Sequence, residues 1–301
     1  MIAAHHHAHL DDGPALQATG LTIGYRSAPV VTGIDLDLPR GAVLALVGSN
    51  GSGKSTLLKT LVGLLAPLDG ELQVLGQPAG ARHHRPSPGR AAAVAYLSQF
   101  HLERSALPLR AGDVVRMGRF ARHGLWGRLR QADHDAVAAA MARMGIEHLA
   151  DAALRALSGG QRQRVHLAQV FAAEADLLLL DEPTAGLDAP GQERYEQAVA
   201  DETARGAAVV VATHDIGEAA RADQVMLLAQ RVVAYGPPPV VLVPDNLLET
   251  FGIALRNVDG ELLRTGDDHG HDHPAGDDHR HGHGRPHVAP ADQPRRLPPG
   301  H

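Results

Sequence analysis

The chain has 301 residues, enough for one large domain or two small ones, and its 44% hydrophobic content is sufficient for an extended core. A net charge of −6 argues against a nucleic-acid partner, and the absence of cysteine excludes disulfides and thiolate metal sites. No segment approaches the ~20 apolar residues of a membrane span, and no signal-peptide pattern opens the chain, so we expect a cytosolic protein.

The chain begins with a short polar tail, residues 1–14, that contains His5, His6, His7 and His9. This histidine run is either a weak metal ligand or a remnant of cloning. Residues 16–38 then show alternating and apolar stretches, which predict antiparallel strands.

The most specific pattern comes next, in Gly48–Thr56, which fits G-x-x-x-x-G-K-[ST], the phosphate-binding loop (P-loop). The apolar run Ala42–Val47 predicts a buried strand before it, and Lys54–Leu65 predicts a helix after it. In this motif the lysine reaches the β- and γ-phosphates of a nucleotide, and the Ser55 hydroxyl binds Mg²⁺. The predicted nucleotide-binding residues here are Gly48, Ser49, Asn50, Gly51, Ser52, Gly53, Lys54, Ser55 and Thr56.

The middle of the chain changes character. A strand is predicted at residues 70–74 and a loop at 76–89, and the pattern is helical from about Ala111 to Ala156, most clearly over Asp133–Met144. The arginines of this stretch form either a solvated face or a contact with acidic groups of a membrane protein or of lipid. They are Arg104, Arg110, Arg116, Arg119, Arg122, Arg128 and Arg130.

Leu157–Arg164 (LSGGQRQR) opens a predicted helix, Gln161–Ala173, whose first N–H groups can hold an anion. Strand and helix patterns alternate from there to about residue 263, which indicates a mostly parallel sheet covered by helices. One apolar strand ends in the acids Asp181 and Glu182, and another is followed by His214.

Six segments together resemble the ATP-binding subunits of ABC transporters, over about residues 15–264. The segments are the P-loop, Leu157–Arg164, Leu177–Glu182, Thr184–Asp188, Val209–His214 and Tyr96–Gln99. The resemblance implies an α/β fold: a P-loop NTPase (RecA-like) core, an antiparallel β subdomain, and an inserted helical subdomain at about residues 100–157 that docks the membrane subunit.

The same resemblance implies an ATPase mechanism. Glu182 would polarise the attacking water as general base, His214 would contact the γ-phosphate, and Lys54 would hold the phosphates. Gln99 would approach both the metal and the water, so the implied Mg²⁺ ligands are Ser55, Gln99 and Asp181.

Further nucleotide contacts are implied at two places. Tyr25 would stack on adenine. The second chain of a homodimer would supply the remaining contacts, so that two chains enclose two ATP molecules. The residues expected at that interface are Ser158, Gly159, Gly160, Gln161 and Asp188. The implied partners are an integral-membrane permease and an extracytoplasmic substrate-binding protein, which would place the chain on the cytoplasmic face of the membrane.

Residues 265–301 contain almost nothing apolar, and we expect this tail to be disordered. Imidazole and carboxylate groups suit Zn²⁺, although the metal affinity of such a tail can also be incidental. The candidate zinc ligands are His269, His271, His273, His279, His281 and His283.

The cargo is suggested by softer similarities. Asp113–Arg119 resembles the ATPases of metal-chelate and metal-ion importers, and Val243–Gly252 resembles the zinc and manganese uptake subfamily. With the tail, these favour a zinc or manganese importer; the alternative is an importer of iron–siderophore, haem or cobalamin. Two other classes are a soluble ATPase acting on DNA or ribosomes, which a single cassette disfavours, and a metal-buffering protein, which the intact catalytic pattern disfavours.

Overall fold

The computed structural model describes residues 13–79, 94–98, 108–123, 128–252, 256–258 and 261–263. The chain divides into two units, residues 1–265 and 266–301, and every described residue belongs to the first. Gln99, the N-terminal histidines and the six candidate zinc ligands of the tail lie outside the described residues. The proposed domain boundaries therefore stay predictions.

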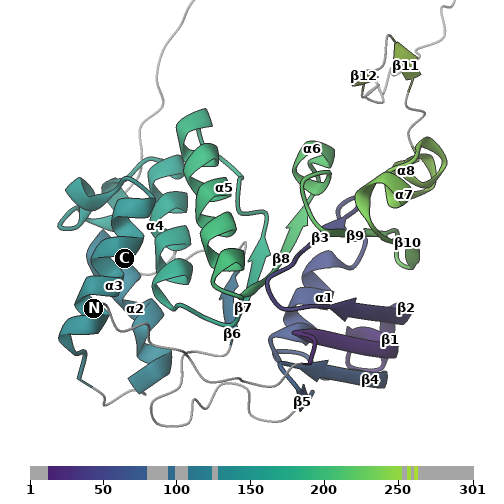
Figure 1. Ribbon diagram of the computed structural model, residues 1–301, viewed down its shortest axis with the longest axis horizontal. Helices are drawn as coiled ribbons and strands as arrows, with labels where there is room; N and C mark the ends of the chain where they lie inside the picture. Colours follow the sequence, from purple (N-terminus) through teal and green to yellow (C-terminus); the bar gives the residue numbers. More distant parts are fainter. Residues whose placement is uncertain are drawn as a thin grey trace, which may run out of the picture. The chain divides into compact units, whose positions relative to one another are not determined.

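Strands and helices alternate along most of the described chain (Figure 1). The strands are β1 (Leu16–Tyr25), β2 (Ala28–Leu38), β3 (Val43–Val47), β4 (Asp69–Val74), β5 (Gln77–Pro78), β6 (Val94–Leu97), β7 (Leu177–Asp181), β8 (Ala208–Thr213), β9 (Gln224–Leu228), β10 (Val232–Gly236), β11 (Arg256–Val258) and β12 (Glu261–Leu263). The helices are α1 (Lys54–Leu61), α2 (Ala111–His123), α3 (Gln131–Arg143), α4 (Gly159–Ala172), α5 (Ala189–Ala204), α6 (Ile216–Ala219), α7 (Pro238–Val241) and α8 (Pro244–Phe251), with 3₁₀ turns η2 (Glu147–Leu149) and η3 (Leu154–Ala156).

The strands form two main sheets. The first is antiparallel and has the order β2-β1-β4-β5. The second has the order β10-β9-β3-β8-β7-β6, and its strands are parallel except for β10. Strands β11 and β12 form a separate antiparallel pair. This arrangement confirms the predicted α/β fold with an antiparallel subdomain and a helical region.

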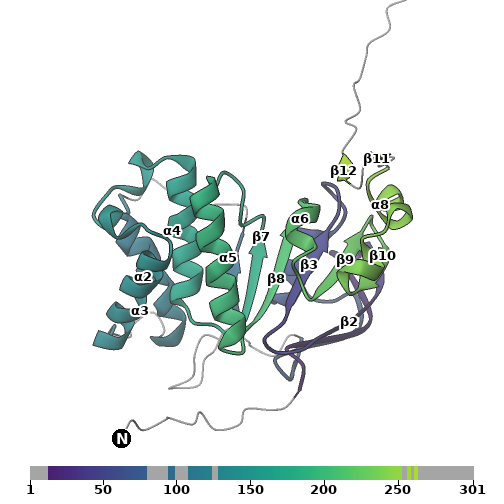
Figure 2. The ribbon, with the colours of Figure 1, turned by 45° about the horizontal axis from the view of Figure 1, so that its top comes forward.

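The six-stranded sheet is covered on both faces, and β7 shows how. Leu177 and Leu179 pack in a core with α1 and the antiparallel sheet. Leu178 and Leu180 point to the opposite face and pack in a core with α2, α3, α4 and α5. Each fully buried leucine stabilises the fold by about 1.5–3 kcal/mol. The run of four leucines therefore joins two cores through one strand, β7, which is labelled in Figure 2.

Helix α1 is shorter than the sequence pattern predicts. It ends at Leu61 rather than Leu65, because Val62 caps it and Gly63 follows with a φ of 80°. A residue in this left-handed conformation ends a helix by turning the chain away from the helix axis. Among the described residues, no helix is long and apolar enough to cross a bilayer.

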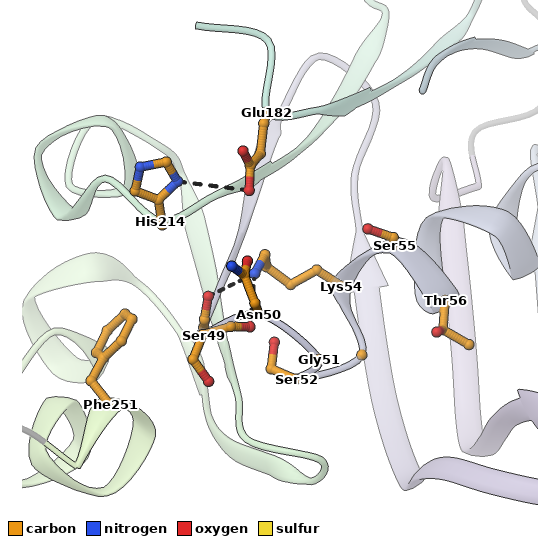
Figure 3. Close-up of a pocket in the computed structure, with 12 residues that line it drawn as sticks. Ser49, Asn50, Gly51, Ser52, Lys54, Ser55, Thr56, Glu182, His214 and Phe251 are labelled. Atoms are coloured by element: carbon orange, nitrogen blue, oxygen red, sulfur yellow. Dashed lines mark hydrogen bonds and ion pairs between the residues drawn. The ribbon is translucent and has the colours of Figure 1, made fainter. Parts of the chain in front are cut away.

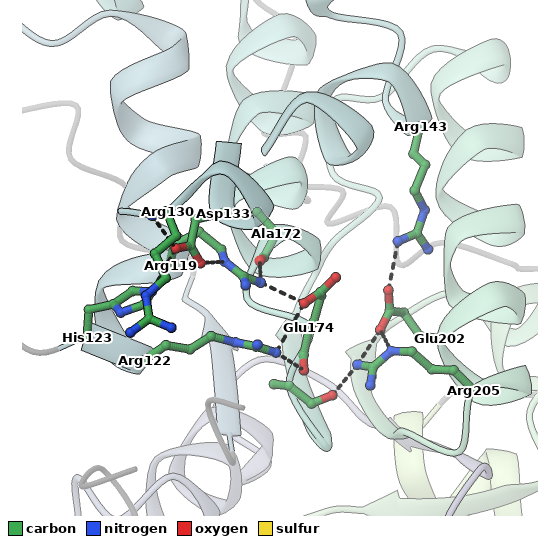
Figure 4. Close-up of polar contacts among 11 residues, drawn as sticks. Arg119, Arg122, His123, Arg130, Asp133, Arg143, Ala172, Glu174, Glu202 and Arg205 are labelled. Atoms are coloured by element: carbon green, nitrogen blue, oxygen red, sulfur yellow. Dashed lines mark hydrogen bonds and ion pairs between the residues drawn. The ribbon is translucent and has the colours of Figure 1, made fainter. Parts of the chain in front are cut away.

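Helix α2 is joined to α3 by a buried ion pair and to Glu174, just after α4, by partly exposed ones (Figure 4). The Arg119 guanidinium bonds to Asp133 Oδ1 at 2.9 Å, to Glu174 Oε2 at 2.8 Å and to the Ala172 carbonyl at 2.8 Å. Arg122 also pairs with Glu174, at 3.1 Å. Since the Arg119 side chain is only 4% exposed, it belongs to neither a solvated face nor a docking surface.

A second polar cluster joins α3 to α5 (Figure 4). Arg143 donates to Glu202 Oε1 at 2.8 Å and to the Ala198 carbonyl at 2.8 Å, and its guanidinium lies 5.0 Å from the centre of the Phe171 ring. Arg205 bonds to the same Glu202 carboxylate and to the Ala175 carbonyl. The helical region is thus tied to the sheet-covering helix α5 as well as to α4.

Candidate active site

A cavity of about 710 Å³ lies around the P-loop, at the carboxyl ends of the parallel strands (Figure 3). It brings together Glu182 and His214, which lie far from the P-loop in sequence. The lining residues are Gly48, Ser49, Asn50, Gly51, Ser52, Gly53, Lys54, Ser55, Thr56, Glu182, His214 and Phe251. Clefts at this edge of a parallel α/β sheet are the usual place for a ligand.

The P-loop takes its shape from the residues at its end. Gly53 has a φ of 112°, and a Cβ atom there would lie 2.5 Å from Val31 Cγ2, so that only glycine fits. The helix α1 begins at the next residue, Lys54. The loop therefore leads directly into a helix N-terminus, where free N–H groups can bind phosphate oxygens.

Lys54 lies at the centre of the loop and is buried. Its Nζ donates hydrogen bonds to the carbonyls of Gly48 at 2.6 Å and Ser49 at 3.1 Å (Figure 3). Burial lowers the pKa of Lys54, and the carboxylates of Glu182 and Asp181 partly oppose this effect. The ammonium group thus lies near both acids, and of the two Glu182 lines the same cavity.

Asp181, the last residue of β7, is 3% exposed and touches Ser55. Burial raises the pKa of Asp181, while a hydrogen bond from the Ser55 hydroxyl lowers it. One carboxylate oxygen, Oδ1, is buried without a hydrogen-bond partner of regular geometry among the described residues. A hydroxyl beside a carboxylate with an unused oxygen is a donor set that fits Mg²⁺, which takes one or two protein oxygens together with phosphate oxygens.

Glu182 and His214 face each other across the cavity. Glu182 follows β7 with a φ of 50°, and its backbone N–H donates to the Ala212 carbonyl on β8 at 2.9 Å. His214 follows β8, and its Nδ1 lies 3.7 Å from Glu182 Oε1. The Glu182 side chain is 18% exposed, so its carboxylate can reach a water molecule in the cavity. A positive φ at a residue other than glycine is uncommon and is concentrated at functional positions.

Ser158, Gly159, Gly160 and Gln161 do not line the cavity of their own chain. Ser158 Oγ accepts from the Gln161 N–H at 3.3 Å, while Gln161 Oε1 accepts from the Ser158 N–H at 2.9 Å. This capping box fixes the start of α4. Binding of an anion at this helix end stays a prediction.

Asp188 likewise caps the N-terminus of a helix, α5. Its Oδ1 accepts from the Gly191 N–H at 3.1 Å, and its Oδ2 lies 3.5 Å from the Arg164 guanidinium on α4. The 184–188 loop is therefore held between the beginnings of two helices, outside the cavity.

Tyr25 lies beside the end of the P-loop but does not line the cavity. Lys59 Nζ donates to its hydroxyl at 3.3 Å and lies 5.8 Å from the centre of its ring. The pKa of Tyr25 is lowered, chiefly by a hydrogen bond with Thr56. The residue is 44% exposed, so it is accessible to a base from solvent.

Phe251, the last residue of α8, lines the cavity, and our sequence analysis did not single it out. An Arg231–Glu249 ion pair and a hydrogen bond from Asn246 to the Val241 carbonyl hold α8 in place. Among the described residues, no three His, Asp or Glu side chains are arranged to hold a metal by themselves. The predicted zinc ligands cannot be placed, since they lie outside that part of the chain.

Comparison with known proteins agrees with this site. The sequence profile of the family described as ABC transporter matches residues 31–185. The chain is 33% identical over 252 residues to the manganese transport system ATP-binding protein MntB of Bacillus subtilis, covering 83% of this chain and 98% of that protein. It is 44% identical over 245 residues to the hemin import ATP-binding protein HmuV of Nocardia farcinica, covering 78% and 82%.

Among solved structures, a metal-chelate type ABC transporter in an inward-facing conformation is similar with a TM-score of 0.68. Its sequence identity is 26%, over 84% of this chain and 96% of that one. A P-loop cavity lined by Glu182 and His214, with the buried Asp181 next to Glu182 in the chain, defines a nucleotide-hydrolysing protein. The chain belongs to the ABC transporter family, as an ATP-binding subunit with ATPase activity.

Proposed function

We propose that two copies of the chain close on two ATP molecules and that their hydrolysis powers a membrane importer. The cavity around Lys54, Glu182 and His214 carries this proposal. Each site would be completed by Ser158, Gly160 and the 184–188 loop of the second copy. The start of α4 supports this, since it is a helix N-terminus that does not line its own chain's cavity.

Within each site, Lys54 exchanges its bonds to the loop carbonyls for bonds to the β- and γ-phosphates. Glu182 accepts a hydrogen bond from the attacking water and takes its proton as the water adds to the γ-phosphorus. His214, 3.7 Å from Glu182, donates to the γ-phosphate beside that water. When bound at Ser55 and Asp181, Mg²⁺ supplies charge neutralisation for the phosphates.

The cargo that we propose is zinc or manganese. The manganese-transport relative supports this because its alignment extends over nearly its whole length, and the α8 region lies within the stretch that resembles metal-ion uptake ATPases. The histidine- and aspartate-rich tail lies outside the described residues, but its side chains are of the types that bind metal ions, which favours a metal-ion cargo.

Haem, or another iron chelate, is the second candidate. The hemin-import relative is more identical to this chain than the manganese-transport relative, 44% against 33%. Its alignment covers a smaller share of the relative's own length, 82% against 98%. We place this cargo second for that reason.

We further propose an integral-membrane permease and an extracytoplasmic substrate-binding protein as partners, with the chain bound to the cytoplasmic face of the membrane. The solved transporter with a TM-score of 0.68 supports this assembly, because a chain of this fold occurs there in a complete transporter. Closure of the two copies would favour one state of the permease only through contacts that differ between the two states.

The test is accumulation of zinc, manganese and iron by cells that carry either the wild-type chain or Glu182→Gln, supplied with metal salts or with haem. We expect Glu182→Gln to abolish uptake of zinc or manganese salts and to leave haem-iron uptake unchanged. Loss of haem-iron uptake alone would establish the second candidate instead, and no change in any metal would refute both.

A further inference from the structure

A second cavity, of about 290 Å³, is lined by residues of α5, α6, β3 and β8, elements that are labelled in Figure 2. Glu218 of α6 and Tyr195 of α5 both line it. Both oxygens of the Glu218 carboxyl are buried, and neither has a hydrogen bond of regular geometry among the described residues. A buried carboxyl without regular hydrogen bonds destabilises the fold, so a functional role is a reasonable explanation for Glu218.

Two buried hydroxyls lie against this carboxyl. They belong to Tyr195, which is 3% exposed, and to Thr213, which is 2% exposed. Burial raises the pKa of Glu218, and the nearby hydroxyls of Thr213 and Tyr195 act in the opposite direction. Outside them, Arg221 pairs with Glu196 at 2.6 Å and closes the rim of the cavity.

Thr213 connects this cluster to the active site. It is the last residue of β8 and precedes His214, and its Oγ1 accepts from the Asp215 N–H at 3.0 Å. Asp215 in turn caps α6, with its Oδ1 accepting from the Gly217 N–H at 2.7 Å. The turn that carries His214 is therefore held by side chains on both sides of the histidine.

Tyr195 connects the cluster to the 184–188 loop. It lies two turns along α5, the helix that Asp188 of that loop caps. A shift of α5 that accompanied movement of the loop would displace the Tyr195 hydroxyl from Glu218. The cluster thus joins two segments that both belong to the proposed nucleotide sandwich.

We propose that Glu218 is a positioning residue for ATP hydrolysis: with Tyr195 and Thr213 it fixes the turn that presents His214 and links that turn to α5. This inference rests on the proposed contact between His214 and the γ-phosphate. Glu218 acts through His214 and touches no part of the nucleotide.

The test compares kcat and KM for ATP in wild type, Glu218→Gln, Tyr195→Phe and His214→Ala, and in Glu218→Gln combined with His214→Ala. Glu218→Gln and Tyr195→Phe nearly keep the size of the side chain, so the fold should survive, and thermal unfolding checks all variants. We expect Glu218→Gln and Tyr195→Phe each to lower kcat roughly tenfold with little change in KM, about the effect of losing one positioning polar contact. Glu196→Gln, at the rim of the same cavity, is the matched control and should keep the wild-type kcat.

The combined variant gives the decisive result. If Glu218 acts through His214, the Glu218→Gln change should lower kcat no further in the His214→Ala background. An equal loss in both backgrounds would refute the positioning role, as would an unchanged kcat in the single variants. Wild-type activity in His214→Ala would refute the proposed role of His214 as well, so the two failures are distinguishable.

Discussion

Lys54 occupies the centre of the P-loop with its ammonium bonded to the carbonyls of Gly48 and Ser49. The same Nζ atom would bind the nucleotide phosphates. Its removal therefore abolishes both the bonds to the loop carbonyls and the contact with the phosphates. We expect Lys54→Ala to lower ATP turnover by about 100-fold or more, in line with the loss of one preorganised charged donor. Phosphate release under saturating ATP measures this. Lys59→Ala, on the same helix, should keep turnover, and equal losses in the two variants would contradict the assignment.

The ring and the hydroxyl of Tyr25 can be tested separately. If its ring stacks on adenine, Tyr25→Ala should raise KM for ATP roughly tenfold, since base–aromatic stacking contributes about 1–3 kcal/mol. Tyr25→Phe keeps the ring and removes the hydrogen bonds with Lys59 and Thr56, and it should keep the wild-type KM. A raised KM in Tyr25→Phe alone would show that the hydroxyl contacts matter instead.

The active-site residues that could be predicted from the sequence are those that lie in short local motifs. The P-loop lies between a strand and a helix as its spacing predicts, and Asp181, Glu182 and His214 follow the strands β7 and β8 directly. Phe251 and Glu218 have no such pattern, because tertiary packing alone brings α8 to the P-loop and α6 to Tyr195. Their roles could be inferred only from the folded chain.

At the scale of elements, the junction of α2, α3 and α4 depends on Asp133. Its carboxylate bonds to Arg119 and also accepts from the Arg130 N–H at 2.8 Å, at the start of α3. Asp133→Ala leaves a buried guanidinium without this partner, so we expect destabilisation by about 3 kcal/mol. Asp135→Ala, an exposed aspartate on the same helix, should change stability by less than about 0.5 kcal/mol. Urea unfolding measures both, and equal effects would contradict the role of the buried pair.

The same residue predicts a pH dependence of stability. Burial alone would raise the pKa of Asp133, but hydrogen bonds from the Arg130 backbone, His123 and Arg119 lower it from 3.8 to about 2. A pKa lowered on folding stabilises the fold above the unfolded value, and this contribution is lost as pH falls from about 4 towards 2. The Tm difference between wild type and Asp133→Asn should therefore be constant above about pH 5 and shrink below pH ~4. A difference that did not change with pH would contradict this.

Most helices and strands could be predicted from periodicity, but the pairing of their charges could not. Arg119 lies 14 residues from Asp133 and 55 residues from Glu174, so no local spacing indicates either bond. The basic stretch therefore gave two open interpretations, whereas the structure pairs Arg110, Arg116, Arg119 and Arg122 with acids of the same chain. Helix α1 likewise ended early because of one backbone conformation after Val62.

At the scale of the whole molecule, the proposed sandwich predicts a change in mass. Glu182→Gln keeps the cavity but removes the base, so ATP should stay bound and hold two copies together, while turnover falls by about 100-fold or more. Light scattering with ATP should show twice the 31.7 kDa mass of one chain. The control is the same variant without ATP, which should be a monomer. Hydrolysis at the wild-type rate would show that Glu182 is not the general base.

The two faces of β7 have a consequence for how the molecule works. Leu177 and Leu179 are held in one core and Leu178 and Leu180 in the other, while the strand ends in Asp181 and is followed by Glu182. Packing on both faces therefore restricts the motion of β7, and with it the positions of Asp181 and Glu182. If the helical region and the antiparallel sheet rotate during a transport cycle, β7 can stay in place between them. The two carboxylates then keep their positions while the parts around them move.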